Sequence, residues 1–147
     1  MKVVDANVLI YAVDEASPHH LAAYSWLNDA LSHVEPVVIP WLCLLAFIRI
    51  TTHPRLSASP LSANQAMDIV DGWLASPAVR TDHPIPRLAS SLRRNLGNTG
   101  VGGNLVNDAW LAALAVESDA TLVSFDNDFQ RFPNVRWLNP ANVSHLN

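Results

Sequence analysis

Two aspartates are set among apolar residues, where a carboxylate is costly to bury without a partner. Asp5 lies between the apolar pair Val3-Val4 and the apolar run 8–11. Asp108 is the only charged residue of the stretch NLVNDAWLAALAV, and the spacing of its neighbours puts it along an otherwise apolar helix face. Each of these carboxylates therefore needs a cation or a buried partner nearby.

Two further aspartates extend this acidic set. Asp126 and Asp128 follow the apolar segment ATLVSF, as Asp5 follows an apolar pair. In an open parallel sheet, ligands bind beyond the carboxyl ends of the strands, near the point where the strand order reverses. Carboxylates gathered at such a rim repel one another unless a multivalent cation neutralises them, and hard oxygen ligands suit Mg²⁺ or Mn²⁺. The pattern predicts a metal ion at this rim.

Each aspartate also has a structural explanation. A single Asp after a strand is often the N-cap of the helix that follows, which applies to Asp5, Asp126 and Asp128. Asp108 lies inside a predicted helix, so a structural role there requires a buried partner instead. The capping explanation stays open for each residue alone, whereas the set as a whole favours the metal site.

Strand-like and helix-like segments alternate along the chain, which predicts a largely parallel sheet covered on both faces. Strands are expected at 3–4, 36–40, 78–82, 120–125 and 134–139. Helices are expected over 17–33, 41–52, 62–76, 86–97 and 104–118. Ser17 as an N-cap, a capping box of Ser62 and Gln65, and Gly97 as a terminator are expected to define helix ends. The loop 97–104 is expected to be a flexible connection within a single domain that spans residues 1–147.

The composition is typical of one globular domain. Of 147 residues, 50% are hydrophobic and 15% are charged, and no apolar run reaches the ~18 residues of a membrane-spanning helix. The N-terminus has no secretion signal pattern and Cys43 is the only cysteine, so we expect a cytoplasmic protein with no membrane partner. The net charge is −4, yet four arginines fall within residues 80–94, enough either for a basic patch or for a solvated helix face.

Lysine is nearly absent, since Lys2 is the only lysine among nine basic residues. Haloacid-dehalogenase-like phosphatases and response-regulator receivers also have an Asp after the first strand, but both need a lysine. The phosphatases further need a second Asp where this chain has Asn7. There is no GxxxxGK loop for a nucleotide phosphate and no glycine-flanked serine elbow for a Ser-His-Asp triad. These classes are excluded.

Three segments carry a family resemblance: VVDANVLIYA at the start, PWLCLLAFIRITTHPR in the middle and NLVNDAWLAALAVESDATLVSFDNDFQRFPNVRWLNP toward the end. In the last, an Asp on an Ala/Leu-rich helix is followed 18 residues later by an Asp after a strand, with a Phe-x-x-Phe-Pro tail. The chain resembles PIN-domain ribonucleases, specifically the VapC-type toxins of bacterial toxin-antitoxin pairs. The resemblance implies a three-layer α/β/α sandwich with a mainly parallel five-stranded sheet.

The resemblance also implies a function, a metal-dependent endoribonuclease that acts as the toxin of a type II toxin-antitoxin system. It assigns Asp5, Asp108 and Asp126 to catalysis and to an Mg²⁺ or Mn²⁺ cofactor. Its implied partners are an RNA substrate, a small VapB-like antitoxin and a second copy of the chain. The mostly apolar segment 41–50 is a candidate contact surface, because its large apolar residues go round the helix rather than keeping to one stripe.

Further residues are expected around the metal and the RNA. Asn7, Ser124 and Asp128 are expected to orient a carboxylate or a bound water from outside the metal's own ligands. The arginines expected to contact RNA are Arg49, Arg80, Arg87, Arg93 and Arg94.

One position departs from the family pattern. PIN nucleases usually carry an acid in the helix after the second strand, at the fourth residue of the segment CLLAFIR, where this chain has Ala46. Glu117 is no replacement, because it lies nine residues past Asp108 and about half a turn out of phase with it. Two hypotheses follow: a metal site with one carboxylate fewer, or a degenerate PIN domain that binds RNA or a protein without cleavage.

Overall fold

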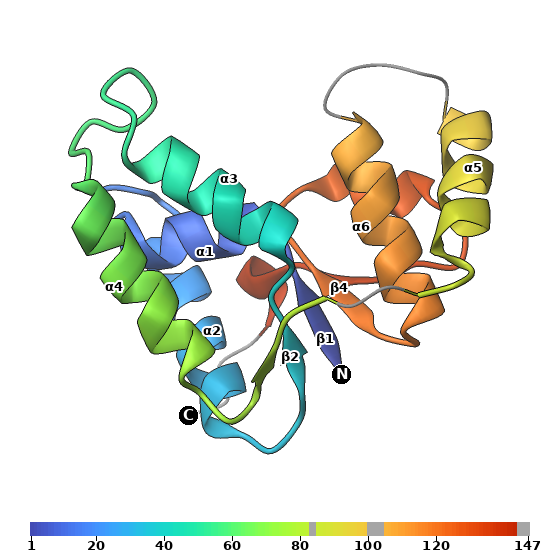
Figure 1. Cartoon of the computed structure of the whole chain (residues 1–147), viewed down its shortest axis with the longest axis horizontal. Helices are drawn as coiled ribbons and strands as arrows, with labels where there is room; N and C mark the ends of the chain where they lie inside the picture. The colour runs from blue at the N-terminus through green and yellow to red at the C-terminus, as the bar shows by residue number, and fades with distance from the viewer. Residues whose placement is uncertain (83–84, 100–104, 144–147) are drawn as a thin grey trace.

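The structure is a computed structural model that describes residues 1–82, 85–99 and 105–143 (Figure 1). Within these residues the strands are β1 (Lys2–Val4), β2 (Val37–Val38), β3 (Val79–Arg80), β4 (Thr121–Val123) and β5 (Arg136–Leu138). They form a five-stranded sheet in the order β3-β2-β1-β4-β5, in which every neighbouring pair is parallel. The predicted parallel sheet is confirmed, and each strand overlaps its predicted segment.

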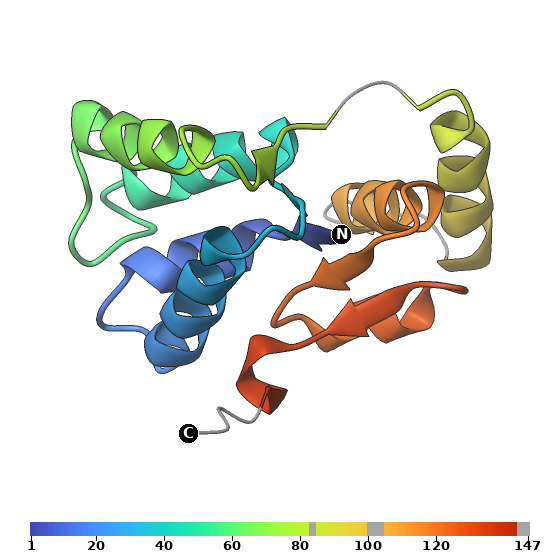
Figure 2. The same ribbon diagram turned by 90° about the horizontal axis from the view of Figure 1, so that it is seen from below.

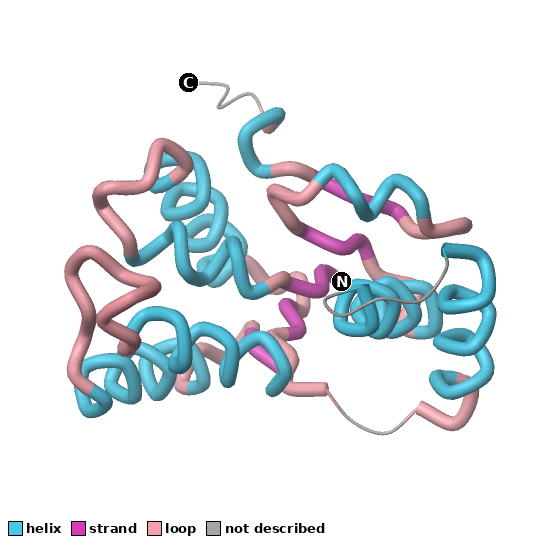
Figure 3. Tube along the Cα trace, turned by 90° about the horizontal axis from the view of Figure 1, so that it is seen from above, coloured by secondary structure: helices cyan, strands magenta, loops and turns pink. Residues whose placement is uncertain are grey.

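The helices cover the sheet on two sides. They are α1 (Ala6–Val13), α2 (His20–Ser32), α3 (Trp41–Thr51), α4 (Ala63–Leu74), α5 (Leu88–Thr99) and α6 (Leu105–Glu117), with short 3-10 turns η1 (Asn127–Arg131) and η2 (Pro140–Asn142). Helices α1 to α4 lie on one side of the strands, and α5 and α6 pack against each other on the other side (Figures 1 and 2). Figure 3 shows the strands as a central band between these groups. The predicted three-layer α/β/α sandwich is confirmed.

Some helix ends follow the predicted signals. Ser62 and Gln65 form the expected capping box of α4: the Ser62 hydroxyl accepts the Gln65 N–H at 3.1 Å, and the Gln65 side chain accepts the Ser62 N–H at 2.9 Å. Helix α3 begins at Trp41, as predicted, and the Asp82 carboxylate accepts the Trp41 N–H at 2.7 Å. Both helix starts are thus satisfied by a side-chain oxygen.

One helix was missed and two expectations about helix ends are wrong. The apolar run 8–11 belongs to α1, which was not among the expected helices and whose N-cap is Asp5, in agreement with the structural explanation for that residue. Ser17 does not cap the next helix, because its hydroxyl accepts the His19 N–H at 3.1 Å in a turn and α2 begins only at His20. Gly97 does not end α5, which continues to Thr99, since Gly97 lacks the left-handed conformation of a terminating glycine. The rest of the predicted loop, 100–104, lies outside the described residues.

The core explains why α6 is so rich in alanine and leucine. This helix lies between the sheet and α5, and six of its residues are buried: Ala109, Leu111, Ala112, Ala113, Leu114 and Ala115. All of them except Ala113 join fully buried strand residues such as Val3, Val4, Leu122 and Val123 in a continuous apolar cluster. No helix within the described ranges is long and apolar enough to cross a membrane.

Candidate metal centre

The site lies where the strand order of the sheet reverses. β1 pairs with β2 on one side and with β4 on the other, and Val4 is opposite Val123. Beyond these residues the backbones stay in contact, because the Asp5 N–H donates to the Val123 carbonyl at 3.0 Å. Asp5 and Ser124 are thus the first residues past the carboxyl ends of two adjacent parallel strands, the usual place for a ligand in such sheets.

Both oxygens of the Asp5 carboxylate accept hydrogen bonds. Oδ1 accepts the Ala6 N–H at 2.6 Å, and Oδ2 accepts the Ser124 hydroxyl at 2.7 Å. Burial raises the pKa of Asp5, and the charge of Asp126 acts in the same direction, whereas these two hydrogen bonds lower it. Asp5 is therefore the N-cap of α1, as the structural explanation holds, and it also faces a second carboxylate.

A polar network around Ser124 holds Asp5 in place. Asn7 Nδ2 donates to Ser124 Oγ at 2.9 Å, and Asn7 Oδ1 accepts the Phe125 N–H at 3.2 Å. Ser124 Oγ also accepts the Asp126 N–H at 3.0 Å. Asn7 and Ser124 thus lie beside Asp5, where they were expected to orient its carboxylate.

Asp126 and Asp128 differ in their surroundings. Asp126 Oδ1 accepts the Asp128 N–H at 2.8 Å and caps the turn η1. Asp128 is exposed, and its carboxylate pairs with Arg131 at 2.9 Å. Asp126 is bonded to the Ser124 network through its N–H, whereas the Asp128 side chain pairs with Arg131 within the turn η1.

Asp108 completes the acidic cluster, which we define as Asp5, Asp108, Asp126 and Asp128. It lies half-buried in the first turn of α6. Burial is the largest cause that raises its pKa to about 6, followed by the negative charges of Asp5, Asp126 and Asp128, while Arg131 acts in the opposite direction. The four carboxylates, from three separate chain segments, therefore share one electrostatic environment.

The acidic cluster offers carboxylate oxygens, the ligand type that a hard divalent cation prefers. Within the described ranges, no group of three His, Cys, Asp or Glu side chains is placed so that it could hold a metal ion. Mg²⁺ does not need one, because it usually keeps several waters and takes one or two carboxylates together with substrate phosphates. Cys43 is not a suitable ligand, since burial and the charges of Asp5, Asp82 and Asp108 raise its pKa well above the ordinary value and keep it a thiol.

Position 46 lies on helix α3 one turn after Cys43. The charges of Asp5 and Asp108 raise the pKa of Cys43, and Ala46 is half-buried on the same face of the helix. The Glu117 carboxylate, in contrast, pairs with Arg87, the residue before α5, at 3.7 Å and with Arg94 of α5 at 3.6 Å. The sequence argument against Glu117 as a replacement acid agrees with this position.

The five arginines expected to bind RNA are spread over α3, β3, α5 and the residue before α5, Arg87. Arg80 donates to the carbonyls of Pro77 and Val79, both at 2.7 Å, so it is folded onto its own segment. Arg87 and Arg94 are paired with Glu117, while Arg93 on α5 and Arg49 on α3 are exposed. Helix α6 lies between α3 and α5 (Figures 1 and 2), so these arginines do not make one patch.

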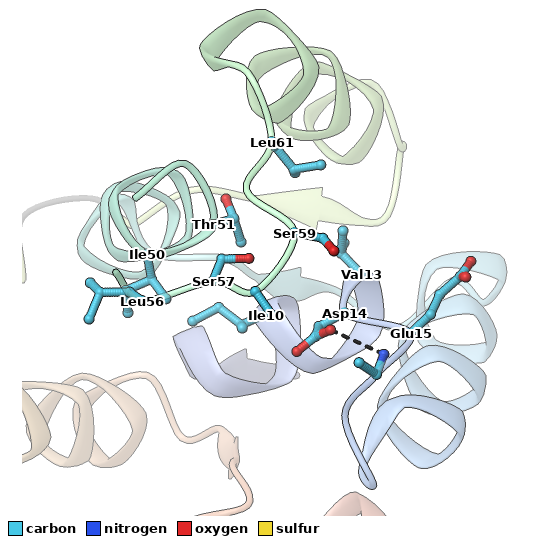
Figure 4. Close-up of a pocket in the computed structure, with 12 residues that line it drawn as sticks. Ile10, Val13, Asp14, Glu15, Ile50, Thr51, Leu56, Ser57, Ser59 and Leu61 are labelled. Atoms are coloured by element: carbon cyan, nitrogen blue, oxygen red, sulfur yellow. Dashed lines mark hydrogen bonds between the residues drawn. The ribbon is translucent and has the colours of Figure 1, made fainter. Parts of the chain in front are cut away.

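A pocket of about 380 Å³ lies apart from the acidic cluster, at the carboxyl ends of α1 and α3 (Figure 4). Its apolar lining includes Ile10, Val13 and Ile50. Asp14 at its edge accepts the Ala16 N–H at 3.1 Å, the dashed line in Figure 4. None of the expected metal ligands lines this pocket, so the chemistry is assigned to the acidic cluster.

Comparisons with known proteins agree on one family. The family model for the PIN domain matches residues 2–135. The chain is 49% identical over 140 residues to ribonuclease VapC37 of Mycobacterium tuberculosis, which covers 95% of this chain and 97% of that protein. It is 38% identical over 148 residues to VapC ribonuclease Mb2897 of Mycobacterium bovis, which covers 99% of this chain and all of that protein.

Solved structures share the fold at lower identity. VapBC2 from Rickettsia felis, bound to a DNA fragment from its promoter, matches with a TM-score of 0.67 and 20% identity over 94% of this chain and 97% of that one. VapC20 of Mycobacterium tuberculosis, a toxin that cleaves the sarcin-ricin loop, matches with a TM-score of 0.65 and 19% identity over 92% and 99%.

Proposed function

The chain belongs to the PIN-domain family, and from this premise we propose that it is a metal-dependent endoribonuclease, the VapC-type toxin of a toxin-antitoxin pair. The name ribonuclease of a relative at 49% identity supports the reaction class. The observation that carries the proposal is the acidic cluster: Asp5 and Asp126 follow the adjacent strands β1 and β4, and Asp108 feels the charge of both. Burial and the charges of Asp5, Asp126 and Asp128 raise the pKa of Asp108 to about 6, and a bound cation would offset the repulsion among these carboxylates.

In the proposed reaction Asp5, Asp108 and Asp126 would hold Mg²⁺ or Mn²⁺. The chemistry that such an ion would supply is polarisation of the scissile phosphate and a lower pKa of a water molecule. Ser124 keeps the Asp5 carboxylate in position through its 2.7 Å hydrogen bond, and Asn7 orients the Ser124 hydroxyl. No protein nucleophile is required for this hydrolysis.

The proposed partners follow from the same family. VapBC structures that share the fold contain toxin and antitoxin together, which supports a small VapB-like antitoxin for this chain. A basic side chain of such an antitoxin would neutralise the acidic cluster. Trp41 and Leu45, one turn apart on α3, are 44% and 59% exposed, and they support a further contact, with a second copy of the chain. As part of the same proposal, the reaction takes place in the cytoplasm.

The test is cleavage of a mixed RNA pool with Mn²⁺ or with EDTA. We expect new RNA ends from the parent protein with Mn²⁺ only, and none from Asp5→Asn. Asp29→Asn is the matched control, because Asp29 is on α2 and its side chain is 76% exposed. This variant should cleave RNA like the parent. A parent without products would favour the alternative, a PIN domain that binds without cleavage, for which Ala46 was the only argument. Products from Asp5→Asn would overturn the metal assignment.

A further inference from the structure

Three aromatic rings from distant parts of the chain meet at the edge of the acidic cluster. Tyr11 and Phe125 pack edge to face, with ring centroids 5.3 Å apart. His19 lies against both, 5.1 Å from Tyr11 and 4.8 Å from Phe125, with its plane tilted by 38° to each. Tyr11 and Phe125 are half-buried, whereas His19 is exposed. We call these residues the aromatic trio.

The aromatic trio is attached directly to the site network. Phe125 stands between Ser124 and Asp126, and its N–H donates to Asn7 Oδ1 at 3.2 Å. Tyr11 is four residues after Asn7 on α1, so it lies on the same face of that helix one turn on. The aromatic trio is therefore adjacent in sequence to Ser124 and Asp126 of the site.

The exposed member of the aromatic trio is held in place by its own segment. The Ser17 hydroxyl accepts the His19 N–H at 3.1 Å, and the ring of the next residue, His20, is bonded through Nδ1 to the Tyr11 carbonyl at 2.9 Å. The turn between α1 and α2 is thus bonded within itself before His19 and to α1 directly after it. The backbone is held on both sides of His19, and the ring packs against Tyr11 and Phe125.

An acidic site that cuts RNA must obtain binding energy from something other than phosphate attraction. The chain has a net charge of −4, Arg87 and Arg94 are paired with Glu117, and Arg131 is paired with Asp128 of the acidic cluster itself. Stacking of a base on an aromatic ring does not depend on charge, and single-stranded RNA offers unstacked bases to Phe, Tyr and His rings. An exposed, fixed aromatic surface beside the acids suits such a base.

We propose that His19 and Phe125, supported by Tyr11, stack a nucleobase of single-stranded RNA next to the phosphate at the acidic cluster. This inference rests on the proposed ribonuclease function. It makes the aromatic trio a substrate-positioning surface, and it restricts cleavage to sites where at least one base beside the scissile phosphate is unpaired.

The test uses single-stranded RNAs of eight nucleotides in which 2-aminopurine occupies each position in turn. They are bound to the full chain carrying Asp5→Asn, in Mg²⁺, so that the RNA stays intact. We expect fluorescence quenching at one position or two adjacent positions. Adding His19→Ala should weaken binding about 5- to 150-fold and remove the quenching, whereas His19→Phe should keep both. His33→Ala is the matched control, because His33 is an exposed histidine at the other end of α2.

An abasic nucleotide at the quenched position separates stacking from indirect effects. If the base stacks on the aromatic trio, His19→Ala causes no further loss of affinity for the abasic RNA. The same loss on abasic and complete RNA, no loss on either, or no binding of any of these RNAs would overturn the inference. Cleavage by the parent chain is measured separately: failure there rejects the ribonuclease proposal, while cleavage with unaltered binding by His19→Ala rejects only the stacking surface.

Discussion

At the scale of single residues, Ser124 organises the site. A serine hydroxyl offers one donor and two acceptor positions, and Ser124 uses all three. It donates to Asp5 Oδ2 and accepts from Asn7 Nδ2 and the Asp126 N–H. Because its proton is committed to Asp5 and the side chain is fully buried, Ser124 is suited to positioning a carboxylate and not to attacking a phosphate.

Ser124→Ala should therefore be costly although it removes only one oxygen atom. The Asn7 amide and the Asp126 N–H lose their acceptor, which should lower the free energy of unfolding by about 1–3 kcal/mol. Urea unfolding at pH 7 with EDTA measures this loss. Ser90→Ala is the control, because Ser90 is exposed and its hydroxyl donates to the Arg87 carbonyl at 2.9 Å. Equal effects of the two substitutions would show that the Ser124 network adds no stability.

The pKa of Asp108 makes metal-free stability depend on pH. Its ordinary pKa of 3.8 is raised to about 6 in the folded chain, so between these values the folded state binds the proton more tightly than the unfolded state. The stabilisation is complete below the unfolded pKa and is lost as the pH rises through about 6. Because Asp108 is half-exposed, we expect a loss on the order of 1 kcal/mol, less than the full shift implies.

Asp108→Asn removes this dependence and tests it. In EDTA the variant should be more stable than the parent by on the order of 1 kcal/mol at pH 8, and the difference should disappear only as the pH falls below 3.8, as measured by chemical unfolding. Saturating Mg²⁺ should stabilise the parent at pH 8 and leave the variant nearly unchanged. A variant that is less stable than the parent at pH 8 would mean that Asp108 has a favourable partner and not a repulsive neighbourhood.

At the scale of elements, local patterns predicted what local interactions decide. The capping box of Ser62 and Gln65 is complete within four residues, and it appears in the structure as expected. Helix α1 was not predicted, because it has only eight residues and is apolar nearly all round, so it shows no amphipathic period. Its cap, Asp5, is held by a hydroxyl 119 positions away, which no local pattern reveals.

The same distinction applies to the site. Asp5, Asp126, Asn7 and Ser124 could be predicted, because each lies at the end of a strand or in the turn after it, and parallel strands bring their carboxyl ends to one edge. The arginines could not, since their distribution depends on which helices lie next to one another. The aromatic trio was also missed, although Phe125, beside Asp126, was a usable signal.

Helix α3 carries the prediction most specific to this chain. Ala46→Glu should add a carboxylate to the site, because position 46 is one turn beyond Cys43, which already feels Asp5 and Asp108. Mn²⁺ affinity measured by calorimetry should rise at least about tenfold, the scale of weaker changes around metal sites. Cleavage should then need less Mg²⁺, without necessarily reaching a higher maximal rate, since a more negative site also repels the RNA phosphate.

Leu45→Glu is the control for this helix. Leu45 is 59% exposed in the single chain and about 100° round α3 from position 46, so a carboxylate there points away from position 46 and should leave Mn²⁺ affinity unchanged. Unaltered affinity in Ala46→Glu, with helix content intact by circular dichroism, would show that position 46 does not face the ion.

At the scale of the whole molecule, charge and apolar surface are separated. Asp5 and Asp126 of the acidic cluster follow β1 and β4, whereas Arg87 and Arg94 pair with Glu117 where α5 packs against α6. Figure 1 shows α6 between the sheet and α5. Exposed apolar side chains such as Trp41 and Leu45 occupy α3. The acidic cluster and the exposed apolar side chains of α3 are therefore two separate surfaces.

The last prediction concerns self-association through α3. Burying Trp41 and Leu45 against a second copy favours a dimer, and Leu45→Glu would bury an unpaired carboxylate in that contact. We expect the parent to have the mass of a dimer by light scattering and Leu45→Glu to dissociate at least about tenfold more readily. Leu21→Glu is the matched control, because Leu21 is 72% exposed on α2 and should leave the mass unchanged. A parent monomer, or a Leu45→Glu protein that stays as dimeric as the parent, would exclude α3 as the contact; in either case RNA cleavage by the acidic cluster of one chain would be unaffected, since all four of its carboxylates come from the same copy.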